Sequence, residues 1–247
     1  MDRTKTVVTP ERYASGMTFE VYLAYVASPE NLRREASPGG ERRRDWSTWM
    51  RSWYDSLRLS DAQTAAIRWL AAQPEGPRRI LVISEEWSSD CRRDVPMLQR
   101  LAEAGGLELR IFRRDGQRFG RSQRPSLAEA PDSNADLMAE FLNEKRGETW
   151  QSIPVAVFYT ADLRYLYHYI EYPRIYDKDG LVYGHIRVPR PGETPEATGA
   201  RIEREFAALQ ASPFFRIWAS AAADEILSAL HERVVLGPRP SIQGRGG

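Results

Sequence analysis

Apolar residues recur at helical spacing through the first part of the chain. Three segments have this pattern: residues 18–28, 46–57 and 60–72. Thr18 precedes the first segment as an N-cap, and Ser60 with Gln63 fits a capping box at the start of the third. The turn-rich, basic stretch 28–44 predicts a loop. The pattern therefore predicts a helical N-terminal extension over residues 1–76, packed on whatever core follows.

The pattern changes after residue 76 to strands that alternate with helices. The predicted strands are residues 80–84, 107–112, 153–159 and 163–171, and the predicted helices between them are residues 90–104 and 133–145. The first strand, ILVIS, is almost wholly apolar, as expected of a strand buried on both faces. The last two strands are separated by three residues, which predicts a hairpin. This order predicts an α/β fold with a central mixed sheet flanked by helices.

The C-terminal part continues the domain to about residue 236. Its predicted elements are short strands at 174–176 and 181–188 around a turn at 177–180, helices at 196–210 and 213–232, and a flexible tail over residues 237–247.

Composition and charge narrow the functional classes. The chain has 247 residues, 42% of them apolar, and a formal net charge of +1, which gives no global case for binding nucleic acid or an anionic membrane. No run approaches the roughly 18 apolar residues of a membrane span. The first 16 residues lack the apolar stretch of a secretory signal, so a cytoplasmic location is expected. One cysteine excludes an internal disulfide, and three scattered histidines predict no metal site.

The stretch ISEEWSSDC, residues 83–91, lies between the first predicted strand and the following helix. A tryptophan followed at once by Cys-x-x-Cys is typical of a thioredoxin active site, and here Ser88 stands in the place of the first cysteine. Pro96 follows Cys91 by five residues, the offset of the kinking proline in thioredoxins, and Ile153-Pro154 opens the third predicted strand.

On these residues the chain resembles the thioredoxin-like superfamily over about residues 60–171. The text PEGPRRILVISEEWSSDCRRDVPML resembles a bacterial thioredoxin family with an E-x-W-C-x-D-C type motif and a helical N-terminal extension. The resemblance implies a thioredoxin-like domain over residues 77–236, with an insertion at about 174–195 and extra C-terminal helices. It also implies a site that consists of Ser88 and Cys91 as catalytic positions and Trp87, Ser89, Asp90, Ile153 and a cis Pro154 as substrate-binding positions.

Ser88 changes what such a site can do. A serine hydroxyl cannot form a disulfide, and it needs an adjacent base to become a nucleophile; Glu85 and Glu86 are the nearest carboxylates in sequence. The two-cysteine cycle therefore cannot run within this chain. Cys91 lies one turn inside the predicted helix, which favours a semi-buried, weakly reactive thiol.

Three functional hypotheses follow. The first is a monothiol or glutathione-linked redox protein, with a peptide thiol or disulfide or glutathione as substrate. In it, Ser88 and Ser89 would hydrogen-bond a glutathione thiolate; the alternative is that the two serines only cap the helix. The second is a non-catalytic module that holds a peptide in an open groove. The third is a structural or oligomerising protein whose groove is covered by residues 174–195 or the C-terminal helices. The sequence does not fix the oligomeric state.

Aromatic and basic side chains outside this motif are expected to have structural roles. Trp46, Trp49 and Trp53 share a helical face, and Tyr165, Tyr167 and Tyr169 share a face of a strand; packing is expected for both sets. The basic cluster is expected to be a solvated loop and not a nucleic-acid patch; it consists of Arg113, Arg114, Arg118, Arg121 and Arg124.

Overall fold

The computed structural model describes residues 8–37, 40, 42–145 and 147–237. Its centre is a four-stranded sheet in the order β2-β1-β5-β6. The strands are β1 (Arg79–Ser84), β2 (Glu108–Arg113), β5 (Val155–Tyr159) and β6 (Tyr165–Ile170). β1 pairs with β2 in parallel and with β5 antiparallel, and β6 completes the hairpin. This mixed sheet, flanked by helices, confirms the predicted thioredoxin-like fold.

The described N-terminal helices are α1 (Pro10–Ala14), α2 (Phe19–Val26), α3 (Pro29–Leu32), α4 (Ser47–Ser56) and α5 (Asp61–Ala72). Side-chain caps open four of these five helices; α4, which follows Trp46, has none. The predicted capping box of Ser60 and Gln63 is present. α3 lies within the stretch predicted to be a loop; Ser28 caps it and Pro29 occupies its first turn, a signal for a short helix that the composition of the stretch concealed.

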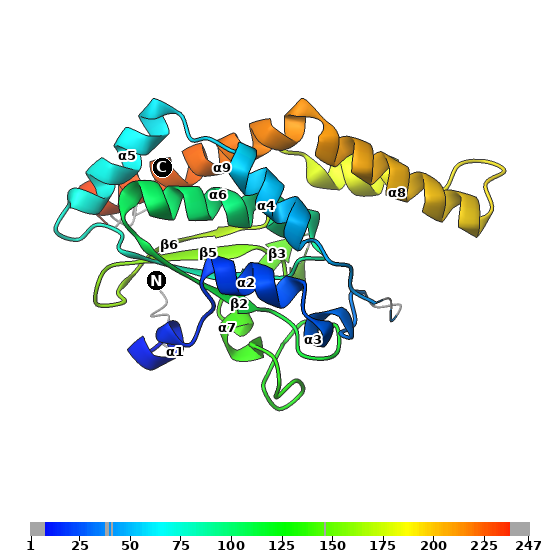
Figure 1. The fold of residues 1–247 in the computed structure, drawn as a ribbon, viewed down its shortest axis with the longest axis horizontal. Coiled ribbons are helices and arrows are strands. Elements are labelled where there is room, and N and C mark those ends of the chain that lie inside the picture. The colour runs from blue at the N-terminus through cyan, green and yellow to red at the C-terminus, as the bar shows by residue number, and fades with distance from the viewer. Residues whose placement is uncertain (1–7, 38–39, 41, 146, 238–247) are drawn as a thin grey trace, which may run out of the picture.

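Helix α6 (Ser89–Gly105) joins the two parallel strands and packs against β1. Gly106 ends it in the left-handed conformation, with φ 65°. Helices α4, α5 and α9 (Pro213–His231) cover α6 on its outer side, whereas α7 (Ala135–Ala139) lies on the other side of the strands (Figure 1). Trp49 and Trp53 stack in this cover with ring centroids 5.7 Å apart, which confirms the packing role predicted for the tryptophans.

The predicted helix over residues 133–145 is wrong in its second half. α7 ends at Ala139, and the short hairpin of β3 (Asn143–Lys145) and β4 (Glu148–Trp150) follows. Gly147 lies in the turn of this hairpin with φ 80°, a conformation that favours glycine. The apolar residues Leu137, Met138 and Phe141 are buried, so their helical spacing is real but covers only about one turn.

The predicted strands at 174–176 and 181–188 are also wrong. A π-helix, η1 (Asp179–Ile186), and α8 (Pro195–Ala211) form an arm that projects from the sheet (Figure 1). Buried Arg201 holds the arm together, because its guanidinium donates to the carbonyls of Ile186 at 2.7 Å and Val188 at 2.8 Å and pairs with Glu193. A second π-helix, η2 (Glu232–Leu236), follows α9; the predicted tail lies outside the described residues apart from Gly237.

Candidate functional site

Ser88 is the N-cap of α6. Its backbone is extended, and its side-chain oxygen accepts a hydrogen bond from the backbone N–H of Cys91 at 3.4 Å. The carbonyl of Ser88 accepts the first helical hydrogen bond, from Arg92. Ser89 is the first helical residue and is half-buried. The hydroxyl of Ser88 is therefore engaged in capping, as serines at this position commonly are.

Cys91 is fully buried, with no exposed surface. Burial raises the pKa of its thiol to about 12, although hydrogen bonds with Ser84, the backbone of Glu85 and Ser88 act in the opposite direction. A thiol with this pKa is neutral at physiological pH and lacks the thiolate that attacks disulfides. Burial is more complete than the semi-buried state that the sequence led us to expect.

Trp87 follows β1, and its side chain packs against the loop that follows β2. Its indole N–H donates to Oδ2 of Asp115 at 3.3 Å, and its ring lies 5.1 Å from the ring of Phe119. The guanidinium of Arg114 lies 5.0 Å from the Trp87 ring centroid and 4.7 Å from that of Phe119. Trp87 is thus held in place by the loop after β2.

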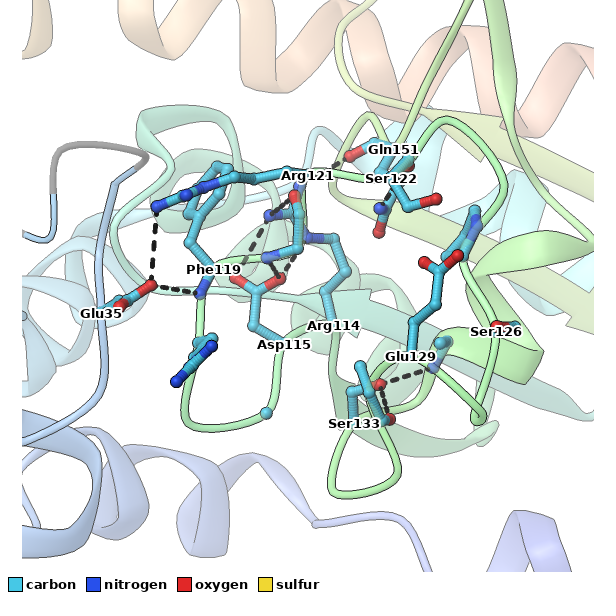
Figure 2. A pocket seen from close by; sticks show the side chains of 16 residues that line it. Glu35, Arg114, Asp115, Phe119, Arg121, Ser122, Ser126, Glu129, Ser133 and Gln151 are labelled. Carbon is cyan, nitrogen blue, oxygen red and sulfur yellow. Dashed lines mark hydrogen bonds and ion pairs between the residues drawn. The ribbon is translucent and has the colours of Figure 1, made fainter.

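The two carboxylates that precede Trp87 belong to a buried ion network, which we call the Glu85 network. It consists of Glu85, Glu86, Asp115, Arg34, Arg43 and Arg114. Glu85 accepts from Arg34 at 2.7 Å and also pairs with Arg43, and Arg43 reaches Glu86 at 2.9 Å. Arg114 pairs with Asp115 at 2.8 Å (Figure 2). Neither glutamate is free to act as a base toward Ser88.

The pKa values of the two glutamates diverge within this network. Burial raises the pKa of Glu85, but Arg34 and Arg43 more than offset it and leave the pKa below its ordinary value. Burial and the neighbouring Glu85 carboxylate raise the pKa of Glu86. The folded protein therefore favours the ionised form of Glu85 and disfavours that of Glu86.

A second buried network surrounds the first turn of α6; we call it the Asp90 network. It consists of Asp90, Arg93, Asp94, Glu171, Lys145 and Lys178. Arg93, fully buried, donates to Asp90 at 2.8 Å and holds Asp94 through two hydrogen bonds of 2.7 Å each. Tyr169, also buried, donates to Asp94 at 2.9 Å, which confirms a packing role for this tyrosine.

Lys178 links the segment 174–195 to the first turn of α6. Its ammonium lies 2.5 Å from Asp90 and 2.7 Å from Glu171. Burial alone would lower the pKa of Lys178, but the two carboxylates raise it above its ordinary value, so the ammonium stays charged. Nearby, Tyr176 stacks on Trp218 of α9 with ring centroids 3.6 Å apart.

The predicted substrate-binding edge is closed by the chain itself. The Ile153-Pro154 peptide bond is cis, and both residues are buried. The carbonyl of Pro154 already accepts a hydrogen bond from the backbone N–H of Glu171 at 2.8 Å. On the other side of α6, Gln210 of α8 accepts from Arg92, whose guanidinium lies 3.8 Å from the Trp46 ring centroid.

The predicted site residues Trp87 to Cys91 lie together at the start of α6, and the structure adds partners that the sequence analysis missed. Arg34 and Arg43 lie in the stretch predicted to be a turn-rich loop, and Lys178 lies in a predicted turn. The solvated-loop prediction is wrong for Arg114, which is buried, whereas Arg118, Arg121 and Arg124 are exposed as predicted.

Among residues 8–37, 40, 42–145 and 147–237, no group of three or more histidine, cysteine or acidic side chains could hold a metal ion. Within the same residues, no helix combines the length and the apolar character needed to cross a membrane.

Comparison with known proteins gives one family and two structures. A family model described as thioredoxin matches residues 40–126. No curated protein matches. A protein of unknown function from Pseudomonas aeruginosa is 15% identical, with 91% of this chain and 98% of that chain covered and a TM-score of 0.49. An HIV epitope-scaffold is also 15% identical, with 90% and 96% covered and a TM-score of 0.44. The strand order and the family match together support a thioredoxin-like domain in this chain.

Proposed function

We propose that this chain is a non-catalytic thioredoxin-like module of thiol–disulfide oxidoreductase ancestry. The observation that carries the proposal is the state of Cys91: the thiol is fully buried and its pKa is raised to about 12. In the proposed module, the residues that surround a redox site in thioredoxins have become a buried, charge-paired structural centre.

A monothiol mechanism would use Cys91 as its nucleophile. Such a mechanism needs an accessible thiolate, and catalytic cysteines have lowered pKa values in electropositive, partly exposed surroundings. Both arginines that follow Cys91 are engaged elsewhere: Arg92 donates to the backbone carbonyls of Glu86 and Trp87, and Arg93 pairs with Asp90 and Asp94. These observations weigh against a monothiol mechanism.

A glutathione-linked mechanism would need a free hydroxyl at Ser88 and an open edge at the cis-proline. Ser88 is only 8% exposed and its oxygen accepts from the N–H of Cys91. Ile153 and Pro154 are buried, and Lys178 with Glu171 lies between this edge and Asp90. The residues present therefore do not fit glutathione in this position.

The same contacts favour a structural role over peptide binding in the thioredoxin groove. Lys178 and Tyr176 of the insertion occupy the space beside the first turn of α6, and Gln210 of α8 contacts Arg92 from the other side. A partner would then bind to another surface of the module.

The proposal is tested by restoring a cysteine at position 88, where thioredoxins have the first cysteine of their motif. The Ser88→Cys variant is expected to form a disulfide with Cys91, because the Ser88 side chain reaches the backbone N–H of Cys91 and lies within hydrogen-bond range of its thiol. Mass spectrometry should find the loss of two hydrogen atoms, and both thiols should disappear. The oxidised variant is still expected to be inactive in the reduction of insulin by dithiothreitol, because the groove stays closed.

Wild type and Cys91→Ala serve as controls in the same assay and should give the uncatalysed rate. A wild-type rate above that of Cys91→Ala would contradict the proposal. A Ser88→Cys variant that folds but does not oxidise would mean that Ser88 does not occupy the position of the first thioredoxin cysteine.

A further inference from the structure

A pocket of about 360 Å³ opens beside the loop that follows β2. It lies at the carboxyl ends of β1 and β2, the edge where open α/β sheets bind their ligands. Its volume falls in the range of small-molecule sites. The pocket shares Arg114 and Asp115 with the Glu85 network, but neither Ser88 nor Cys91 lines it.

The inner wall of the pocket is rigid and its charges are paired. Arg114 donates to both oxygens of Asp115, to the carbonyl of Gln151 at 2.9 Å and to that of Gly120 at 3.4 Å. At the left of Figure 2, Glu35 accepts from the backbone N–H of Phe119 at 3.0 Å and faces Arg121 at 3.8 Å. These four charges form two neutral pairs and leave little for a ligand to satisfy.

Two charged side chains of the pocket lining, Glu129 and Arg118, are not part of these pairs. Within the part of the chain that the structure describes, neither Glu129 nor Arg118 has an ion pair or a side-chain hydrogen bond. Figure 2 shows the Glu129 side chain directed away from Ser133, toward the side of the pocket on which Ser122 and Gln151 lie. The pocket therefore offers one unpaired anion and one unpaired cation on an otherwise neutral wall.

Apolar surface and neutral polar groups complete the lining. The apolar residues are Phe119, Pro125, Ala130 and Ala135. The side chains of Ser126 and Gln151 add a hydroxyl group and an amide oxygen, and neither has a hydrogen-bond partner among the described residues. The amide nitrogen of Gln151 is already used, because it donates to the carbonyl of Ser122. A ligand with an apolar body and two opposite charges would match this lining.

We propose that this pocket binds a small zwitterion, an amino acid or short peptide with free ends, through Glu129 and Arg118. The carboxylate of Glu129 would accept from the ligand's ammonium group, and the guanidinium of Arg118 would donate to its carboxylate. Binding does not involve Cys91 or Ser88, so this inference stands or falls separately from the proposed function.

The test is titration calorimetry on the full chain with leucine and with leucyl-leucine, which separate the two charges by different lengths. We expect one of them to bind. Binding of leucine would identify a free amino acid as the ligand, and binding of leucyl-leucine would identify a short peptide. Glu129→Gln and Arg118→Gln should each weaken binding by about tenfold. Glu144→Gln and Arg204→Gln, exposed residues outside the pocket, are matched controls and should bind as wild type does.

Ligands with one blocked end show which charged group of the ligand contacts Glu129 and which contacts Arg118. N-acetylation of the ligand should weaken binding to wild type but not further to Glu129→Gln, and amidation should weaken binding to wild type but not further to Arg118→Gln. The proposal is overturned if neither probe binds, if both variants bind as wild type does, or if only one of the two charges contributes.

Discussion

Replacement of Arg93 by methionine is expected to lower the free energy of unfolding by about 3–5 kcal/mol. Arg93 is fully buried and pairs with both Asp90 and Asp94. Methionine fills much of the same volume but leaves buried Asp94 without its cation and Asp90 with Lys178 alone, and an uncompensated buried charge is strongly destabilising. Urea unfolding monitored by tryptophan fluorescence measures the change.

Arg44→Met is the matched control for this variant. Arg44 also pairs with a glutamate, Glu203, but both side chains are exposed, at 71% and 66%. Exposed ion pairs contribute at most about 1 kcal/mol, so this variant should unfold close to wild type. Equal effects of the two replacements would show that the Asp90 network is not a structural centre.

Replacement of Glu85 by glutamine is expected to cost on the order of 3 kcal/mol. Glu85 is the shared anion of Arg34 and Arg43, and its side chain also accepts from the backbone N–H of Asp115 at 2.7 Å. Glutamine keeps the shape of the side chain but removes the charge between two buried guanidinium groups. Glu86→Gln is the control, because the pKa of Glu86 is already raised and loss of its charge should change stability by only about 1 kcal/mol.

The Glu85 contribution should also depend on pH in a defined direction. The folded-state pKa of Glu85 lies below its ordinary value of 4.5, so its stabilisation is present above that pH and is lost as the pH falls through the lowered pKa. The difference in unfolding free energy between wild type and Glu85→Gln should therefore be constant near neutral pH and shrink on acidification. A difference that grows on acidification would contradict the lowered pKa.

Local sequence signals were sufficient for the framework of the site. The apolar run 80–83 and the helical spacing after Ser88 placed β1 and α6, and a serine followed by a helical pattern correctly indicated the N-cap. The same signals put Cys91 in the first turn of α6. They could not decide how deeply its thiol is buried, because that depends on elements distant in sequence.

The partners of the site were not predictable for the same reason. Arg34 is 51 residues from Glu85, and Lys178 is 88 residues from Asp90. Each of these cations lies in a polar, turn-rich stretch that reads as solvated loop, and only the packing of the chain reveals that a buried carboxylate faces it. Composition likewise gave no sign of the arm, in which the buried guanidinium of Arg201 donates to the carbonyls of Ile186 and Val188.

The most direct test of a non-redox centre is the rate of Cys91 alkylation by iodoacetamide in native protein, measured from about pH 6 to about pH 10. We expect modification at the rate at which the protein unfolds, with no inflection near the free-thiol pKa of about 8.5. Urea should accelerate it to the rate of a free cysteine. Rapid modification of the folded protein, with an apparent pKa well below that of a free thiol, would mean that Cys91 is a reactive thiolate and would contradict the non-catalytic role.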